Sequence, residues 1–399
     1  MKKLLRKLRS GDGGGLNALS SLIAVLAGLL VGLIVLLLTN PAQAFPAFRT
    51  ILTVGFQESR NFGQILFHAT PIILTGLSVG FAMKTGLFNI GAPGQFAFGA
   101  FVSIFVSLEA TFLPPGIRLV VAILCAMLAG ALWGAIPGLL KAYRNVHEVI
   151  SCIMTNWIGI FLVNWLIERT IVQTARNATP YLPGESTLPG LGLGELFQGA
   201  HARASNVDIG ILIAILAAVF VYIVLDKTKF GYELKACGFN QHAAKYAGIS
   251  EKRNVIFSMM ISGALAALGG ALLYTSAAGF TMQVADTLYM QGFTGISVAL
   301  LGLNHPIGII FGGILIGYLQ EGGIHIQRFF APELIEMVVS IIIYFCAFVL
   351  LFKMLLHRIS NKLFGQSEPP ANPADPPPDA EDSSQSDDDE SLGKEDSAL

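Results

Sequence analysis

The stretch "DIGILIAILAAVFVYIVLDKTKFGYELKACGFNQHAAKYAGIS", residues 208–250, joins two kinds of sequence that are seldom adjacent in a soluble protein. Its first part, residues 208–226, is apolar and, as a helix, long enough to cross the hydrocarbon core of a bilayer. The second part is polar, basic and rich in alanine and glycine, and another apolar run starts at residue 254. The stretch therefore predicts a membrane span followed by a short helical loop in water.

Composition supports a membrane protein for the whole chain. Hydrophobic residues make up 53% of it, charged residues only 13%, and the mean hydropathy is +0.64, whereas soluble domains carry about 25% charged residues. We expect no disulfide framework and no metal site, because the cysteines are scattered, without a CxxC pair or clustered histidines. They are Cys125, Cys152, Cys237 and Cys346.

Apolar segments recur along the chain and predict an all-α polytopic membrane protein with about ten transmembrane helices. Two short segments, 292–303 and 306–320, form either one re-entrant hairpin or two tilted crossings. The ten segments are 18–39, 65–83, 88–108, 117–140, 149–168, 208–226, 254–276, 292–303, 306–320 and 334–353.

The basic residues orient these segments. With the amino terminus in the cytoplasm, 18 of the 25 basic residues and every lysine fall on the cytoplasmic side. This distribution follows the positive-inside rule and predicts that both termini are cytoplasmic. Nothing in it resembles a nucleic-acid-binding patch.

Acidic residues gather at the carboxyl end. Residues 365–399 hold eleven acids against one lysine, are rich in proline and serine and lack an apolar period. Such a segment cannot bury enough apolar surface to offset its ordering entropy. We therefore divide the chain into a transmembrane domain, 1–361, and a disordered acidic cytoplasmic tail, 362–399.

Two apolar regions are interrupted by glycine, proline and asparagine: "TGLFNIGAPGQ" (85–95) and "GLNHPIG" (302–308). Broken helices inside a membrane are tolerated only within protein or beside a water-filled cavity. The polar residues near the breaks are candidates for the solute path, or they simply cap helix ends and join helices. They are Asn89, Gln95, Asn156 and Asn304.

The segment "GYELKACGFNQHAAKYAGIS" (231–250) resembles the cytoplasmic coupling loop of ABC importer permeases, in the nucleoside and simple-sugar branch of the type II importers. The resemblance continues in "TPIILTGLSVGFAMKTGLFNIGAPGQF" (70–96) and "GALWGAIPGLLKAYRNVHEVISCIMTNWI" (130–158) and extends to about residue 355. The chain is most similar to permeases of bacterial nucleoside uptake systems. It departs from the pattern at Pro93, where relatives often have glutamate.

This resemblance implies that residues 227–253 dock on a separate ATPase subunit. Small residues suit close packing in a partner's groove, glycines permit sharp turns, and aromatic and basic side chains suit anchoring and steering. From composition alone, a basic cytoplasmic loop explains the segment equally well. The residues assigned to coupling are Gly231, Lys235, Ala236, Gly238, Asn240, Ala243, Ala244, Tyr246 and Gly248.

The resemblance also implies partners and a location. They are a second permease subunit, identical or different, two ATP-binding subunits and an extracytoplasmic solute-binding protein, all at a bacterial cytoplasmic membrane. No GxxxxGK[ST] sequence occurs, so we expect no cofactor in this chain and ATP with magnesium on the partner ATPase.

The predicted function is therefore import of a small hydroxylated solute, with a nucleoside preferred and a ribose-like sugar as the alternative. An ion-coupled secondary transporter is a further alternative, although such proteins place ionisable groups deep in the membrane. Glu168, Asp208, Asp226 and Glu336 lie near segment ends instead. No HExxH or GxSxG sequence supports an intramembrane enzyme.

Overall fold

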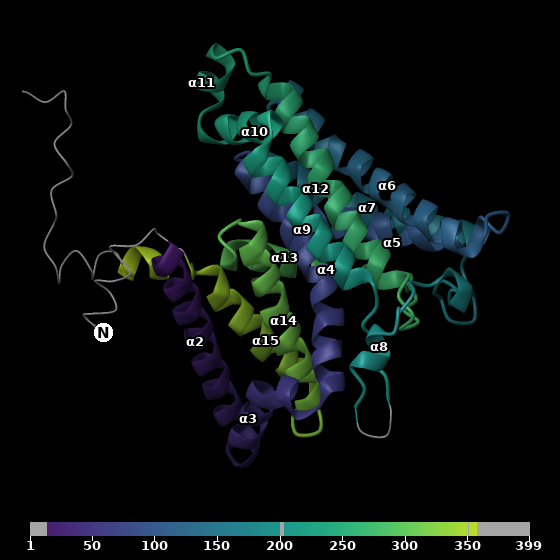
Figure 1. Ribbon diagram of the computed structural model, residues 1–399, viewed down its shortest axis with the longest axis vertical. Helices are drawn as coiled ribbons and strands as arrows, with labels where there is room; N and C mark the ends of the chain where they lie inside the picture. The colour runs from purple at the N-terminus through teal and green to yellow at the C-terminus, as the bar shows by residue number, and fades with distance from the viewer. Residues whose placement is uncertain (1–13, 200–202, 350, 357–399) are drawn as a thin grey trace, which may run out of the picture. The chain divides into compact units, whose positions relative to one another are not determined.

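A computed structural model describes residues 14–199, 203–349 and 351–356 (Figure 1). The helices below belong to a compact unit that ends at Met354. The predicted acidic tail, 362–399, lies outside the described residues.

Within the described residues the chain is helical, with isolated bridges between Gln173, Ala178 and Gln283 and no named strand, as the all-α prediction requires. The helices are α2 (Gly14–Thr39), α3 (Pro41–Gln57), α4 (Ser59–Lys84), α5 (Ala92–Glu109), α6 (Pro115–Arg144), α7 (Glu148–Thr170), α8 (Leu193–Leu196), α9 (Gly210–Lys227), α10 (Lys229–Phe239), α11 (Gln241–Tyr246), α12 (Glu251–Tyr274), α13 (Met290–Leu301), α14 (Pro306–Ile326) and α15 (Pro332–Ala347), with a 3₁₀ turn at Gly184–Ser186.

Each of the ten predicted segments contains a helix, and eight described helices are long and apolar enough to cross a membrane. These are α2, α4, α5, α6, α7, α9, α12 and α14. The two shorter helices are α13, with 12 residues, and α15, with 16. At 1.5 Å per residue α13 is about 18 Å long, less than the roughly 30 Å hydrocarbon core. The predicted count of about ten transmembrane helices is therefore approximate, with eight span-length helices among the described residues.

Backbone geometry ends α13 early. Leu303 and Asn304 both have positive φ, 54° and 56°, which reverses the chain directly after the helix. Pro306 then occupies the first turn of α14, where its missing N–H leaves no helical hydrogen bond unmade. The break predicted at 302–308 is thus a tight turn between two helices.

Helix α3 was not among the predicted segments. It buries Ala44, Ala47, Ile51 and Val54, a narrow stripe at helical spacing, and packs on α14. Because its apolar face is so narrow, the mean hydropathy of this helix is too low to mark it as a membrane span in the sequence.

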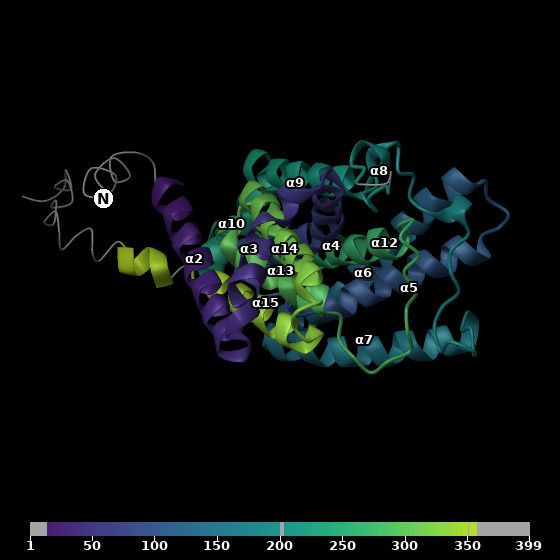
Figure 2. The same ribbon diagram turned by 90° about the horizontal axis from the view of Figure 1, so that it is seen from below.

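Helix α12 lies at the centre of the unit and packs on α4, α5 and α6. Figure 2 shows it between α9 on one side and α6 and α7 on the other. Small residues allow the closest approach: a Cβ added to Gly130 would lie 2.5 Å from the carbonyl oxygen of Gly263, and one on Gly134 2.5 Å from that of Met259. The glycine stripe Gly130, Gly134 and Gly138 thus serves helix packing, as in other membrane bundles.

Candidate functional site

The predicted coupling loop forms two short helices, α10 and α11, between α9 and α12 (Figure 1, top). The Thr228 hydroxyl accepts a hydrogen bond from the Gly231 N–H at 3.1 Å and so caps α10. Helix α10 buries Gly231, Leu234 and Cys237, which recur every three residues on one face. A side chain at Gly231 would collide with the backbone of α9 at Val224 and Leu225, so glycine holds α10 against the end of the preceding span.

Helix α11 has a cap at each end. The Asn240 carboxamide oxygen accepts from the Ala243 N–H at 3.0 Å. At the other end Gly248 has φ +79°, and the N–H of Ile249 returns to the carbonyl of Ala244 at 3.0 Å. This arrangement is a glycine C-cap of the Schellman type. Asn240 and Gly248 therefore shape the loop itself.

An open groove of about 440 Å³ lies between α10 and α11. Its lining includes Ala236, Ala243 and Ala244, whose small side chains leave the groove shallow. Aromatic side chains rim it or stand beside it: Tyr232 is 68% exposed, Phe239 91% and Tyr246 94%. Three aromatic rings held out in water by short capped helices form an apolar surface available to another chain.

The basic residues of the loop divide into paired and free groups. Lys235 Nζ lies 2.9 Å from Asp226 Oδ1 at the end of α9, so Lys235 fastens α10 to that span. Lys229 faces Glu233 at 4.0 Å. Lys245 is exposed on α11. Lys245 and the exposed Lys227 are therefore both available to face an acidic partner.

Gly238 connects the loop to the first broken segment. A Cβ at Gly238 would lie 2.5 Å from the Lys84 carbonyl oxygen and 3.0 Å from the Gly86 nitrogen. Gly86 has φ +75°, and a Cβ there would meet the backbone of Gly238 at 3.2 Å. The two glycines thus put the backbone of α10 directly against the turn that follows α4.

A few residues beyond this contact, four buried polar side chains hydrogen-bond to one another; we name Ser78, Asn89, Gln95 and Ser262 the Asn89 cluster. The Asn89 Nδ2 donates to Gln95 Oε1 at 2.8 Å and to Ser262 Oγ at 2.6 Å. The Ser78 and Ser262 hydroxyls are 2.9 Å apart. The Asn89 side-chain Oδ1 accepts from the Gly91 N–H at 2.9 Å. The cluster joins α4, α5 and α12 across the break.

Asn156 of α7 holds the same break from the other side. Its Nδ2 donates to the Ile90 carbonyl at 2.8 Å, and its Oδ1 accepts from the Gly94 N–H at 3.0 Å. Three predicted path residues, Asn89, Gln95 and Asn156, therefore lie together, and each is hydrogen-bonded within the chain. Asn304 is elsewhere, in the α13–α14 turn, where its buried Oδ1 has no protein partner.

An ionisable group that was not among the predicted residues lies inside a span-length helix. Glu321 of α14 is buried, with Oε2 3.4 Å from His68 Nε2 and Oε1 3.5 Å from His325 Nδ1. The expected segment ended at residue 320, one position too early to include it. The signal was present as "LQEGGIHIQ", where the apolar helix continues through two further glycines and isoleucines.

Comparison with known proteins supports the same architecture. The chain is 35% identical over 357 residues to the guanosine ABC transporter permease protein NupP of Bacillus subtilis (strain 168), covering 87% of this chain and 97% of that protein. It is 34% identical over 351 residues to the nucleoside ABC transporter permease protein NupB of Lactococcus lactis subsp. cremoris (strain MG1363), covering 86% and 94%.

Two further likenesses bear on substrate and assembly. The glucose ABC transporter permease protein TsgB13 of Haloferax volcanii is 33% identical over 337 residues, covering 81% of this chain and 85% of that protein. A second guanosine ABC transporter permease protein of Bacillus subtilis, NupQ, is 29% identical over 265 residues, covering 64% and 79%.

The family model for the permease component of branched-chain amino acid transport systems matches residues 61–347. This range runs from α4 to α15 and includes both broken segments, the Asn89 cluster and the α10–α11 loop. The resemblance to ABC importer permeases is thus confirmed over most of the chain. The chain is a multi-pass membrane protein and belongs to this family of transport permease components.

Proposed function

We propose that this chain is the membrane-spanning subunit of an ABC importer that carries nucleosides into the cytoplasm. The observation that carries the proposal is likeness over nearly the full chain to two permeases, one named for guanosine and one for nucleosides. The described structure supports the proposal with span-length helices, broken segments among them and the short α10–α11 loop at one end.

ATP hydrolysis then belongs to a separate subunit, with magnesium and nucleotide bound there. The chain has no GxxxxGK[ST] sequence to hold phosphates. The α10–α11 groove supports docking of that subunit, because it combines a small-residue floor with exposed Phe239 and Tyr246. Aromatic anchors at the centre of an interface carry a large share of binding energy.

The coupling route follows from the contacts of Gly238. A movement of α10 driven by the ATPase meets the Gly86 turn backbone to backbone, with no flexible side chain between them. The Asn89 cluster and Asn156 hold the segment after that turn against α5, α7 and α12. A displacement of α10 would therefore move the broken segment 85–95 together with the helices that are hydrogen-bonded to it.

The complete importer contains a second permease, ATP-binding subunits and an extracytoplasmic solute-binding protein. Likeness to two guanosine permease proteins of one organism supports a heterodimer of permeases. The lysine distribution supports cytoplasmic termini in a bacterial inner membrane. Impermeant thiol reagents should label Gly190→Cys from outside and Lys245→Cys only from inside; labelling of both from one side overturns this orientation.

A simple sugar is the second candidate solute, favoured by the likeness to a glucose permease protein. An ion-coupled mechanism gains some support from buried Glu321. Two measurements separate these candidates. Uptake in proteoliposomes with and without internal ATP distinguishes the energy source, and parallel uptake of guanosine, ribose and glucose distinguishes the solute.

Docking is tested at the exposed rings. Phe239→Ala and Tyr246→Ala should each reduce co-purification of the ATPase about tenfold or more, since an anchor residue contributes about 2 kcal/mol or more. Tyr143→Ala is the matched control: Tyr143 is 64% exposed and lies beside Lys252, outside α10 and α11. Equal co-purification of all three variants and the parent overturns docking at the loop.

A further inference from the structure

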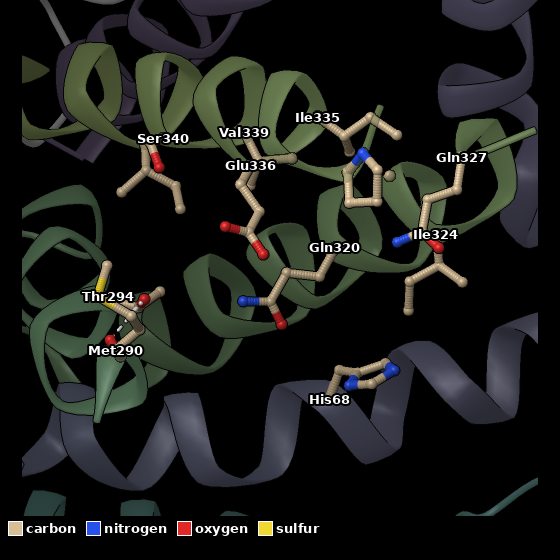
Figure 3. A pocket seen from close by; sticks show the side chains of 13 residues that line it. His68, Met290, Thr294, Gln320, Ile324, Gln327, Ile335, Glu336, Val339 and Ser340 are labelled. Atoms are coloured by element: carbon tan, nitrogen blue, oxygen red, sulfur yellow. Dashed lines mark hydrogen bonds between the residues drawn. The ribbon is translucent and has the colours of Figure 1, made fainter. Parts of the chain in front are cut away.

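A pocket of about 340 Å³ lies between α4, α13, α14 and α15 (Figure 3). Its volume falls at the lower end of the range of about 300–1,000 Å³ for small-molecule sites. It is distinct from the Asn89 cluster, none of whose residues lines it. The size suits one small solute.

The pocket gathers polar side chains on helices that are otherwise apolar. Gln320 comes from α14 and Gln327 is its C-cap, and Glu336 and Ser340, one turn apart, come from α15. Gln327, Glu336 and Ser340 are exposed in the single chain. Polar and ionised groups facing lipid are costly, and in membrane proteins they face water-filled cavities or partner groups. This face is therefore wet or covered by protein.

The side chains converge on one space. In Figure 3 the Glu336 carboxylate and the Gln320 carboxamide point toward each other across the pocket, and the His68 ring lies on the opposite wall. The buried Glu321 carboxylate stands 3.4 Å from His68 Nε2 and so holds that ring from behind. A carboxylate accepts two hydrogen bonds side by side, and a carboxamide both donates and accepts.

A hollow of this kind differs from a helix–helix interface. Membrane helices associate through small residues in close contact, as Gly130 and Gly263 do here. The pocket instead leaves open space in front of Glu336, and no described side chain pairs with that carboxylate. The pocket thus offers an open carboxylate to a solute with neighbouring donors.

We propose that this pocket is a transient subsite for the nucleoside on its way through the permease, with Glu336 accepting from two adjacent donors and Gln320 bonding a neighbouring group. The inference rests on the proposed function. Adjacent donors on a nucleoside come from two sources, the ribose diol and the N–H edge of a purine such as guanine. Both present the same chemistry to a carboxylate.

The test uses the complete importer in proteoliposomes with saturating binding protein, so that delivery of solute does not limit the rate. Glu336→Gln and Gln320→Leu should lower guanosine uptake about tenfold, as expected for losing hydrogen bonds to a charged or amide group. ATP hydrolysis stimulated by the binding protein should stay within about twofold. Glu333→Gln, an exposed acid on the same helix outside the pocket lining, should transport like the parent.

Two analogues identify the source of the donors. If Glu336 bonds the ribose, the parent and Glu336→Gln should import 2′,3′-dideoxyguanosine equally, because this analogue lacks the diol. If Glu336 bonds the base, the two should instead import inosine equally, because inosine lacks the exocyclic amine. Parent-like guanosine uptake by both pocket variants overturns the subsite, as does loss of the second permease on co-purification. If the parent imports only a sugar, the nucleoside function fails, and the same variants assayed with that sugar still test the pocket.

Discussion

The α10–α11 loop and the Asn89 cluster lie on the two sides of the Gly86–Gly238 contact, yet they differ in side-chain exposure. The loop leaves Phe239 and Tyr246 more than nine-tenths exposed. The cluster buries Asn89 and Gln95 completely or nearly so and hydrogen-bonds each to the other. Exposed apolar groups are available to a second chain, whereas satisfied buried polar groups fix internal geometry. Under the proposed function, the exposed residues would bind a partner and the buried ones would transmit movement.

We expect the largest loss of uptake from a substitution at the Gly86–Gly238 contact between the two regions. Gly238→Ala should lower uptake about ten- to hundredfold, because overpacking at a backbone contact costs about 1–3 kcal/mol and shifts α10 away from the turn. Gly248→Ala is the control: the positive φ of Gly248 is unfavourable for alanine, but nothing lies within 4 Å of an added Cβ. Uptake and ATP hydrolysis are measured in the same proteoliposomes. Equal effects of the two substitutions would show that the Gly86 contact has no special role.

A buried carboxyl with one unpaired oxygen should make stability depend on pH, unlike the uncharged Asn89 cluster. Asp208 precedes α9, where its Oδ1 accepts from the Gly210 N–H at 2.8 Å, but its buried Oδ2 has no protein partner. Burial raises the pKa of this carboxyl from 3.8 to about 6, against the lowering effect of the Gly210 hydrogen bond. The folded protein therefore binds the proton more tightly than the unfolded chain does.

This difference in proton affinity determines how the stability of the folded protein changes with pH. The stabilising contribution of protonated Asp208 is complete below about pH 4 and is lost as pH rises through about 6, a loss of up to about 3 kcal/mol. Asp208→Asn should thus raise the unfolding temperature at pH 7.5 and have little effect at pH 4. Thermal unfolding in detergent across this range measures it, with exposed Asp286→Asn as control. A pH-independent effect of Asp208→Asn would contradict the assignment.

Substitution of Asn89 tests how much the hydrogen bonds of the Asn89 cluster stabilise the protein. Asn89→Leu should destabilise the protein by about 2 kcal/mol, since side-chain hydrogen bonds in membrane bundles average about 0.6 kcal/mol and Asn89 makes several. Asn164→Leu is the control, because Asn164 bonds only the Ala285 carbonyl and Asp286 near the surface. Thermal unfolding of both variants gives the difference. An equal loss would mean that burial adds nothing to the cluster.

The sequence predicts the helices well where one physical signal dominates. Span-length apolar runs locate α4–α7, α9 and α12, because each must satisfy its own backbone in lipid. It also assigns Gly238 to the coupling loop, where the structure gives this glycine a close backbone contact. It does not give the partner, Gly86, because the two residues come from segments far apart in the chain. Glu321 was missed for a related reason: a window that ends at the first charge cannot show that histidines from two helices flank it.

The arginines predicted to lie on the extracytoplasmic side give the smallest expected effects. All seven basic residues predicted outside are arginines, which pair well with carboxylates of a docking protein. The structure separates two of them. Arg118 turns inward and donates to the Leu113 carbonyl and the Ser186 hydroxyl, each at 3.1 Å. Arg176 is exposed and lies 4.9 Å from the Tyr181 ring.

Charge reversal should therefore act differently at the two positions. Arg176→Glu should weaken docking of the binding protein severalfold and make docking less sensitive to salt, since an exposed charge pair contributes about 0.2–1 kcal/mol. Arg118→Glu should instead lower the unfolding temperature, because it leaves the Ser186 and Leu113 oxygens without their donor. Titration of the importer with binding protein at low and high salt, beside thermal unfolding, distinguishes the two. If Arg176→Glu changes neither the affinity nor its salt dependence, this arginine only anchors the loop at the membrane surface.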